Sequence, residues 1–137
     1  MAVNDELKML LLREAIEARK MAYTPYSHFQ VGAALLTAED KIYRGCNIEN
    51  GAYSPSNCAE RTAFFKAVSE GERNFSAIAV VGGPEDGALR EVCAPCGVCR
   101  QVMQEFCGPD FEIVLGDSPE HFRTFTLAEI LPLGFDL

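Results

Sequence analysis

The sequence predicts an α/β fold in which helices cover a mixed sheet. Two observations lead to this prediction. Apolar residues recur at helical spacing in three segments, and five short apolar segments have the length and composition of strands. In the second half of the chain, helical segments separate consecutive strands, as in parallel crossovers.

The first predicted element is an amphipathic helix over residues 5–22, with Asn4 as its N-cap and Pro25 beyond its end. Its apolar positions lie on one helical face: Leu7, Leu10, Leu11, Ala15, Ala18 and Ala22. Residues 29–37 and 41–47 follow as a predicted hairpin, because both segments are strand-like and only residues 38–40 separate them.

A second helix is predicted from about residue 58 to 69, capped by Ser56 or Asn57. Residues 76–82 are rich in Ala and Val and predict a buried strand. The following segment, residues 83–91, contains Pro, Asp and Gly and predicts a surface loop.

A third helix is predicted over residues 96–106, entered through a proline. Strands at residues 111–115 and 122–126 complete the sheet, and a short helix begins at residues 129–131. No repeat or linker interrupts the 137 residues, so we expect a single domain over residues 1–137.

Composition excludes several classes of protein. The chain has 12 Lys and Arg against 20 Asp and Glu, a formal net charge of −8. A nucleic-acid-binding protein normally carries a basic face, so we expect no nucleic-acid partner. No long apolar run predicts a membrane span, and no signal peptide is visible, so we expect no membrane partner and a cytoplasmic location.

Two short motifs carry the chemistry: Cys58-Ala59-Glu60 and Pro95-Cys96-Gly97-Val98-Cys99. Three thiolates can hold a Zn²⁺ ion and leave its fourth tetrahedral position for water, as in catalytic zinc sites. A carboxylate beside that position can move the proton of the water. The candidates are Cys58, Cys96 and Cys99 as metal ligands and Glu60 as the proton carrier.

These motifs resemble those of the small zinc-dependent cytidine deaminases. The resemblance extends over about residues 5–135. The segments that carry it are residues 25–35 (PYSHFQVGAAL), 45–50 (GCNIEN), 58–63 (CAERTA), 99–102 (CRQV) and 131–135 (LPLGF). It implies a three-layer α/β/α sandwich with a mixed five-stranded sheet.

The resemblance also implies a reaction. Such enzymes hydrolyse cytidine and 2′-deoxycytidine to uridine and 2′-deoxyuridine with release of ammonia, a step of pyrimidine salvage. Each subunit would hold one Zn²⁺ ion, and the zinc-bound hydroxide would attack C4 of the cytosine. Glu60 would carry protons from the water to N3 and to the departing amino group.

Further roles follow from the same resemblance. Asn47 and Glu49 stand two apart on a predicted strand and therefore face one side, where they would bind the ribose 3′-hydroxyl. Phe29 would stack on the pyrimidine. Backbone groups near Ala59 and Pro95 would hold the edge of the base.

The resemblance assigns three more side chains. Arg61 would donate hydrogen bonds to the ligand thiolates and offset their negative charge. Tyr53 and Phe135 would complete pockets in neighbouring subunits, because the small members of the family are homotetramers with sites at the subunit interfaces. His28 and His121 lie outside the motifs, and we expect both to be non-catalytic.

Alternatives remain for the six cysteines. They include a disulfide framework, a thioredoxin-like redox pair, and an iron–sulfur site in which Met103 occupies the next expected ligand position. A closed structural zinc site would take Cys46, Cys93 or Cys107 as its fourth ligand. At the level of function, the alternatives are a zinc deaminase of another cytosine nucleoside and a non-catalytic, zinc-stabilised binding protein.

Overall fold

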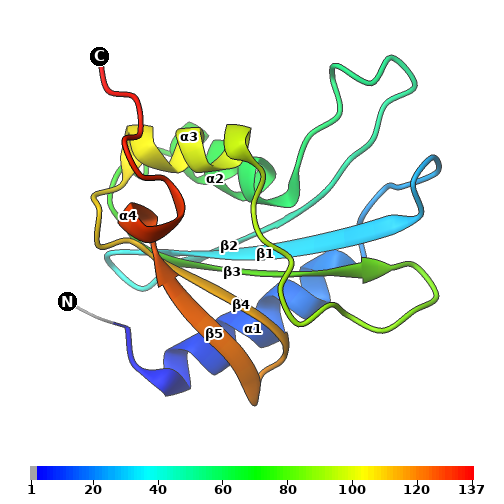
Figure 1. Ribbon diagram of the computed structural model, residues 1–137, viewed down its shortest axis with the longest axis horizontal. Coiled ribbons are helices and arrows are strands. Elements are labelled where there is room, and N and C mark those ends of the chain that lie inside the picture. The colour runs from blue at the N-terminus through cyan, green and yellow to red at the C-terminus, as the bar shows by residue number, and fades with distance from the viewer. Residues whose placement is uncertain (1–2) are drawn as a thin grey trace.

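The computed structural model describes residues 3–137, which form one five-stranded sheet between two layers of helices (Figure 1). The strand order is β2-β1-β3-β4-β5; β3 and β4 are parallel, and the other neighbours are antiparallel. In chain order the elements are α1 (Asp5–Arg19), β1 (Phe29–Thr37), β2 (Ile42–Cys46), α2 (Ala59–Ser69), β3 (Phe75–Pro84), α3 (Gly97–Phe106), β4 (Glu112–Ser118), β5 (His121–Thr126) and α4 (Leu127–Ile130). The three-layer sandwich and the parallel crossover of the second half are confirmed.

The N-terminal helix is shorter than its periodicity predicts. The Asn4 side chain caps it as expected, accepting a hydrogen bond from the amide of Leu7 at 2.9 Å. α1 ends at Arg19, and residues 20–22 form turns in which each amide bonds to the carbonyl three residues earlier. The apolar pattern therefore continues for one turn beyond the helix.

The predicted caps of α2 are wrong. α2 and α3 each begin one residue later than predicted, and their N-caps are Cys58 and Cys96 rather than Ser56 or Asn57. Neither thiol caps its own helix by a hydrogen bond. The two sulfur atoms instead lie 3.7 Å apart, so each helix start presents its side chain to the other.

The end of the chain also differs from the prediction. β4 starts at Glu112 and extends to Ser118, and α4 begins at Leu127 rather than at residue 129. A reciprocal capping box causes the earlier start: the hydroxyl of Thr126 accepts from the amide of Glu129, whose side chain accepts from the amide of Thr126.

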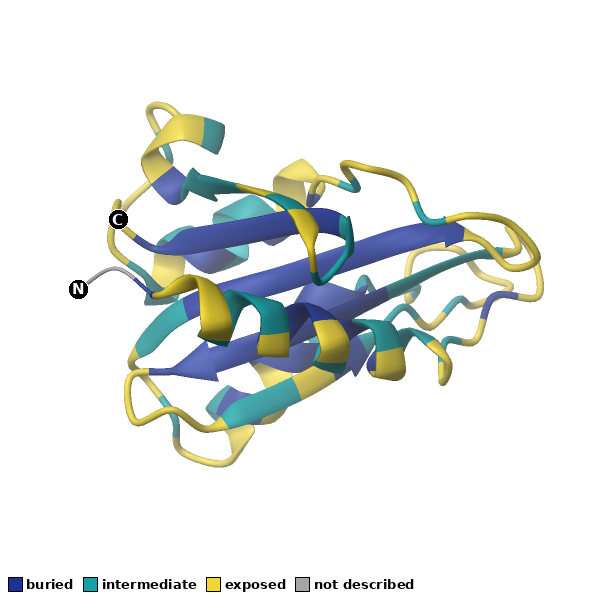
Figure 2. Cartoon of the chain, turned by 90° about the horizontal axis from the view of Figure 1, so that it is seen from below, coloured by how far each residue is buried: buried dark blue, intermediate teal, exposed yellow. Residues whose placement is uncertain are grey.

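Two apolar clusters hold the three layers together, one on each face of the sheet. α1 packs on one face through Leu11, Leu12 and Ala15, while α2 and α3 cover the other through residues that include Phe64 and Met103. Figure 2 shows the resulting burial of the central strands. Among residues 3–137, no helix combines the length and hydrophobicity needed to cross a membrane.

Candidate active site

Three thiols meet where the starts of α2 and α3 approach each other. The Sγ atoms of Cys58 and Cys96 lie 3.7 Å apart, those of Cys96 and Cys99 lie 3.6 Å apart, and all three lie within 4.8 Å of one another. Gly45 of β2 makes this approach possible, because a Cβ atom there would lie 2.3 Å from the carbonyl oxygen of Ala59. A larger residue at position 45 would push the first turn of α2 away from the sheet.

The cluster fits a zinc ion in both chemistry and spacing. Tetrahedral Zn–S bonds of about 2.3 Å place neighbouring sulfurs roughly 3.8 Å apart, close to the two separations found here. Three protein ligands leave a fourth position open, as in catalytic sites. The cysteines therefore form a preorganised metal site without any movement of the backbone.

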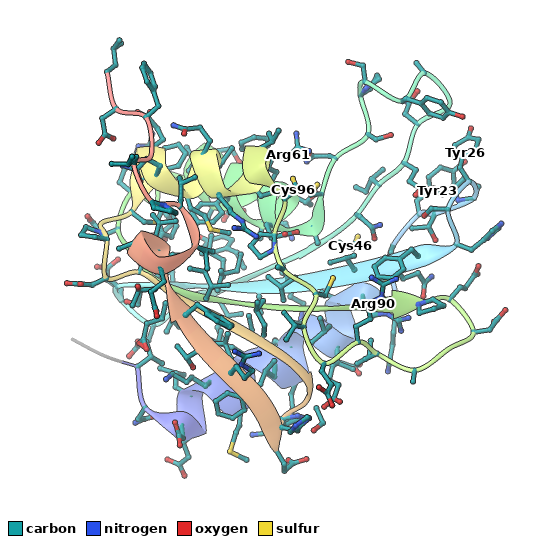
Figure 3. The ribbon with its side chains drawn as sticks, in the orientation of Figure 1. Tyr23, Tyr26, Cys46, Arg61, Arg90 and Cys96 are labelled. Atoms are coloured by element: carbon teal, nitrogen blue, oxygen red, sulfur yellow. The ribbon has the colours of Figure 1, made fainter. Side chains whose placement is uncertain are left out.

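Arg61 lies against this cluster from the first turn of α2 (Figure 3). Its Nη2 donates a hydrogen bond to the Sγ of Cys58 at 3.3 Å, and this contact raises the pKa of the guanidinium. A hydrogen bond from Cys99 and the contact with Arg61 lower the pKa of Cys58 to about 5. Three thiolates with Zn²⁺ carry a formal charge of −1, which the guanidinium can offset.

Glu60 lies beside the same cluster and is only 4% exposed. Its pKa is raised to about 7, chiefly by burial; the nearby Cys58 adds to the rise, and a backbone hydrogen bond and Arg61 oppose it. Because it follows the Cys58 cap by two residues, its carboxyl group is in the first turn of α2, next to the metal ligands. A buried carboxyl group in this position can exchange protons with a water or a ligand in the cavity.

A cavity of about 390 Å³ opens onto the cluster. Its volume is in the range of small-molecule sites. Most of the predicted site residues line this one cavity: Phe29, Asn47, Glu49, Cys58, Ala59, Glu60, Arg61 and Cys96. Residues up to 67 positions apart in the sequence thus meet in one place.

The Asn47 side chain extends the β1–β2 ladder beyond the end of β2. Its Oδ1 accepts from the amide of Val31 at 2.9 Å, and its Nδ2 donates to the carbonyl oxygen of Phe29 at 2.9 Å. The amide of Asn47 in turn donates to the carbonyl oxygen of Val31. One N–H of Nδ2 and one lone pair of Oδ1 stay free for a ligand.

The Glu49 carboxylate closes the turn that precedes β1. It accepts hydrogen bonds from the amides of Tyr26 and Ser27 at 3.0 and 3.1 Å and from the hydroxyl of Ser27. These bonds lower the pKa of Glu49, and the bond from the Ser27 hydroxyl has the largest effect. The amide of Phe29 donates to the same hydroxyl at 3.1 Å. Glu49 and Ser27 therefore fix the residue that begins β1.

Four predicted residues are absent from the lining of this cavity: Tyr53, Pro95, Cys99 and Phe135. Cys99 belongs to the thiol cluster, and Pro95 lies between two lining residues, Ala94 and Cys96. The side chains of Tyr53 and Phe135 are on the surface, 76% and 67% exposed. Pro95 is buried, and its carbonyl oxygen accepts from the Nε of Arg100 at 2.7 Å.

The other three cysteines do not complete the cluster. Within the described residues, the cluster of cysteines able to hold a metal consists of Cys58, Cys96 and Cys99. Cys46, Cys93 and Cys107 do not belong to it. All six cysteines are free. The closed zinc site and the disulfide framework are therefore both wrong as alternatives.

Sequence reasoning missed two contributors to the site. Ser27 lies inside a quoted motif, but its contact with Glu49 spans 22 positions. Arg90 lies in the loop before α3 and covers the ring of Phe29, with its guanidinium carbon 4.7 Å from the ring centroid. No local pattern signals either contact, because each depends on how the turn before β1 meets distant segments.

Comparison with known proteins agrees with this geometry. Residues 5–115 match the family "Cytidine and deoxycytidylate deaminase zinc-binding region". The chain is 51% identical to a cytidine deaminase of Sporosarcina psychrophila over 91% of this chain and 88% of the relative. It is 49% identical to a cytidine deaminase of Halalkalibacterium halodurans over 93% of each chain.

A solved structure shares the fold. The crystal structure of cytidine deaminase from Burkholderia pseudomallei is 46% identical, superimposes with a TM-score of 0.83, and is matched over 97% of its length by 92% of this chain. The family match covers most of the chain, and the thiol cluster lies within the matched residues. The chain therefore belongs to the cytidine and deoxycytidylate deaminase family.

Proposed function

We propose that this protein hydrolyses cytidine and 2′-deoxycytidine to uridine and 2′-deoxyuridine with release of ammonia. One observation carries the proposal: three thiols at the spacing of zinc ligands adjoin a buried carboxyl group at one end of a ligand-sized cavity. Family membership supports the same reaction.

The metal end of the cavity supplies the nucleophile. Cys58, Cys96 and Cys99 would hold one Zn²⁺ ion per chain. When bound, such an ion acts as a Lewis acid that lowers the pKa of a water molecule and so generates a nucleophile near neutral pH. Arg61 reduces the negative charge of the ligand set through its contact with Cys58.

Glu60 moves the protons. Its carboxylate takes a proton from the attacking water and delivers it to N3 of the ring. It then transfers the second proton to the amino group on C4, so that ammonia leaves and a carbonyl group forms. One carboxyl group thus acts first as a base and then as an acid, and no second titrating residue is needed.

The strand end of the cavity binds the nucleoside. Asn47 and Glu49 keep unused hydrogen-bonding capacity beside the cavity, which supports their contact with the 3′-hydroxyl. Phe29 offers a ring face for the pyrimidine. Backbone groups of Ala59 and Pro95, next to the metal ligands, hold the edge of the base.

Tyr53 and Phe135 serve a neighbouring copy of the chain in a homotetramer. Their exposure, and their absence from the lining of the cavity of their own chain, support this assignment. Light scattering on the purified protein tests it: a mass of four chains is expected, and the mass of a single chain would contradict it.

The wider setting follows from the same properties. The protein is a single domain over residues 1–137 that acts in the cytoplasm in pyrimidine salvage. Its net charge of −8 disfavours a polynucleotide and suits an uncharged nucleoside as substrate. It works without a nucleic-acid or membrane partner.

Ultraviolet absorbance during incubation with cytidine tests the function directly. The zinc-loaded protein should convert cytidine to uridine, lose this activity on removal of zinc by a chelator, and regain it on addition of Zn²⁺. Turnover of a different cytosine nucleoside but not of cytidine would favour the first alternative. No turnover of any cytosine nucleoside by folded, zinc-loaded protein would favour a binding protein.

A further inference from the structure

The loop between β3 and α3 places a cation over the ring of Phe29. The guanidinium carbon of Arg90 lies 4.7 Å from the ring centroid, within the range of a cation–π contact. Arg90 lies beside the end of β3 (Figure 3). Among residues 3–137 its guanidinium forms no ion pair, so the aromatic ring is its main contact.

Arg90 approaches the ring from outside the cavity. Phe29 lines the cavity that adjoins the thiol cluster, whereas Arg90 is absent from its lining. The guanidinium therefore covers a part of the ring that does not face the cavity. It leaves the cavity side of the ring open for a ligand.

The backbone on both sides of this contact is fixed. The amide of Phe29 donates to the Ser27 hydroxyl at 3.1 Å, and its carbonyl oxygen accepts from Asn47 at 2.9 Å. The amide of Arg90 donates to the carbonyl oxygen of Gly82 at 2.9 Å, and Gly82 pairs with Val31 on β1. What stays free is the rotation of the Phe29 ring about its side-chain bonds.

Hydrogen bonds also hold the end of β3 and the start of the following loop, next to the turn that precedes β1. The Nη2 atom of Arg19 donates to the carbonyl oxygens of Gly83 and Pro84 at 3.0 and 2.8 Å. The amide of Glu85 donates to the carbonyl oxygen of His28 at 2.7 Å. The loop is therefore docked on the residue that precedes Phe29, and Arg90 is presented to the ring from a defined position.

We propose that Arg90 is a positioning residue that holds the Phe29 ring in the orientation on which the pyrimidine stacks. This inference rests on the proposed function, in which Phe29 contacts the base. A planar guanidinium suits the task better than an ammonium group, because it can lie flat on an aromatic face. Arg90 itself touches neither the base nor the metal ligands.

Kinetics of the zinc-loaded Arg90→Gln variant test the proposal. A cation–π contact at an exposed site is worth about 0.5–1 kcal/mol, which corresponds to a two- to fivefold change in affinity. We expect KM for cytidine and the Kd of uridine, measured by calorimetry, to rise by about this factor while kcat stays within about twofold of the parent. Arg90→Lys should give a smaller increase.

Arg123 provides a matched control. Its guanidinium covers the ring of Phe125 on β5 at 5.0 Å, but neither residue lines the cavity. Arg123→Gln should leave both KM and the Kd of uridine unchanged. An equal rise in the two variants would overturn the proposal, because it would reflect a general effect of lost charge or stability.

A double-mutant cycle separates action through the ring from direct action on the substrate. In a Phe29→Leu background, Arg90→Gln should have no further effect on the Kd of uridine. The assignment of Arg90 is overturned if Arg90→Gln raises the Kd of uridine equally in both backgrounds. It is also overturned if the parent is active and Arg90→Gln has the same KM for cytidine as the parent. A parent without activity on cytidine overturns the proposed function itself, and the assignment fails with it.

Discussion

The two ends of the cavity are built in different ways. At the metal end, Cys58 and Cys96 lie at helix starts, and neither thiol caps its own helix. Their sulfur atoms are in hydrogen-bonding contact with each other, and that of Cys58 also accepts a hydrogen bond from Arg61. At the strand end, the side chains of Asn47 and Glu49 are bonded to the backbone of β1 and of the turn before it.

This difference separates two kinds of residue. The thiols at the metal end are held in place by their helices, so their sulfur atoms are available to bind a metal. The polar side chains at the strand end have two roles, because they complete the fold and also face the ligand. Substitutions at the metal end should therefore change metal binding or chemistry, whereas those at the strand end should change stability and affinity together.

Arg61→Gln sharpens the comparison at the metal end. The variant loses the hydrogen bond to Cys58 and the positive charge that offsets the thiolates. Loss of such a partner of a metal ligand typically costs 10- to 100-fold in metal affinity, and we expect a decrease of this size for Zn²⁺. Competition with a chromophoric chelator measures it.

Arg44→Gln is the control for Arg61. The Arg44 guanidinium forms an ion pair with Glu14, and the Arg44 side chain is 48% exposed. This ion pair lies away from the thiols. Its substitution should leave zinc affinity unchanged. If Arg61→Gln bound zinc as tightly as the parent, the contact with Cys58 would have no role in the metal site.

Asn47→Ala tests the strand end and should have the smaller effect. It removes the two hydrogen bonds that extend the ladder to β1, and we expect the free energy of unfolding to fall by about 1–2 kcal/mol. KM for cytidine should rise in the same variant. Urea denaturation at a fixed excess of zinc and steady-state kinetics measure the two quantities.

Asn50→Ala is the matched control, because within residues 3–137 the exposed Asn50 side chain bonds only to the nearby amide of Ala52. Its free energy of unfolding should change by less than about 0.5 kcal/mol. A loss of affinity without a loss of stability in Asn47→Ala would show that the two ends of the cavity do not differ as described.

Each half of the metal end could be predicted because its information is local, whereas the meeting of Cys58 with Cys96, 38 positions later, is not a local feature. Cys58 and Glu60 are two positions apart, and Cys96 and Cys99 are three apart, so a helix start places each pair without reference to the rest of the fold. The strand β1 was likewise predicted to the residue, since nine mainly apolar residues lie between turn signals.

The strand end could be predicted only in part. The spacing of Asn47 and Glu49 indicates a common face, but not that both side chains bond to segments 16 to 23 positions earlier. The contact of Arg90 with Phe29 joins residues from a loop and a strand that only the sheet brings together. The cysteine caps were missed because propensity favours Ser and Asn, whereas the geometry of the thiol cluster decides the start.

Zinc content and cytidine turnover, measured on one preparation of Glu60→Gln, test the central claim most directly. Gln has nearly the shape of Glu but cannot carry the proton. We expect one zinc per chain, as in the parent, with kcat lower by about 10²- to 10⁴-fold. Turnover close to that of the parent with zinc in place would contradict the role of Glu60 and the division between the two ends of the cavity.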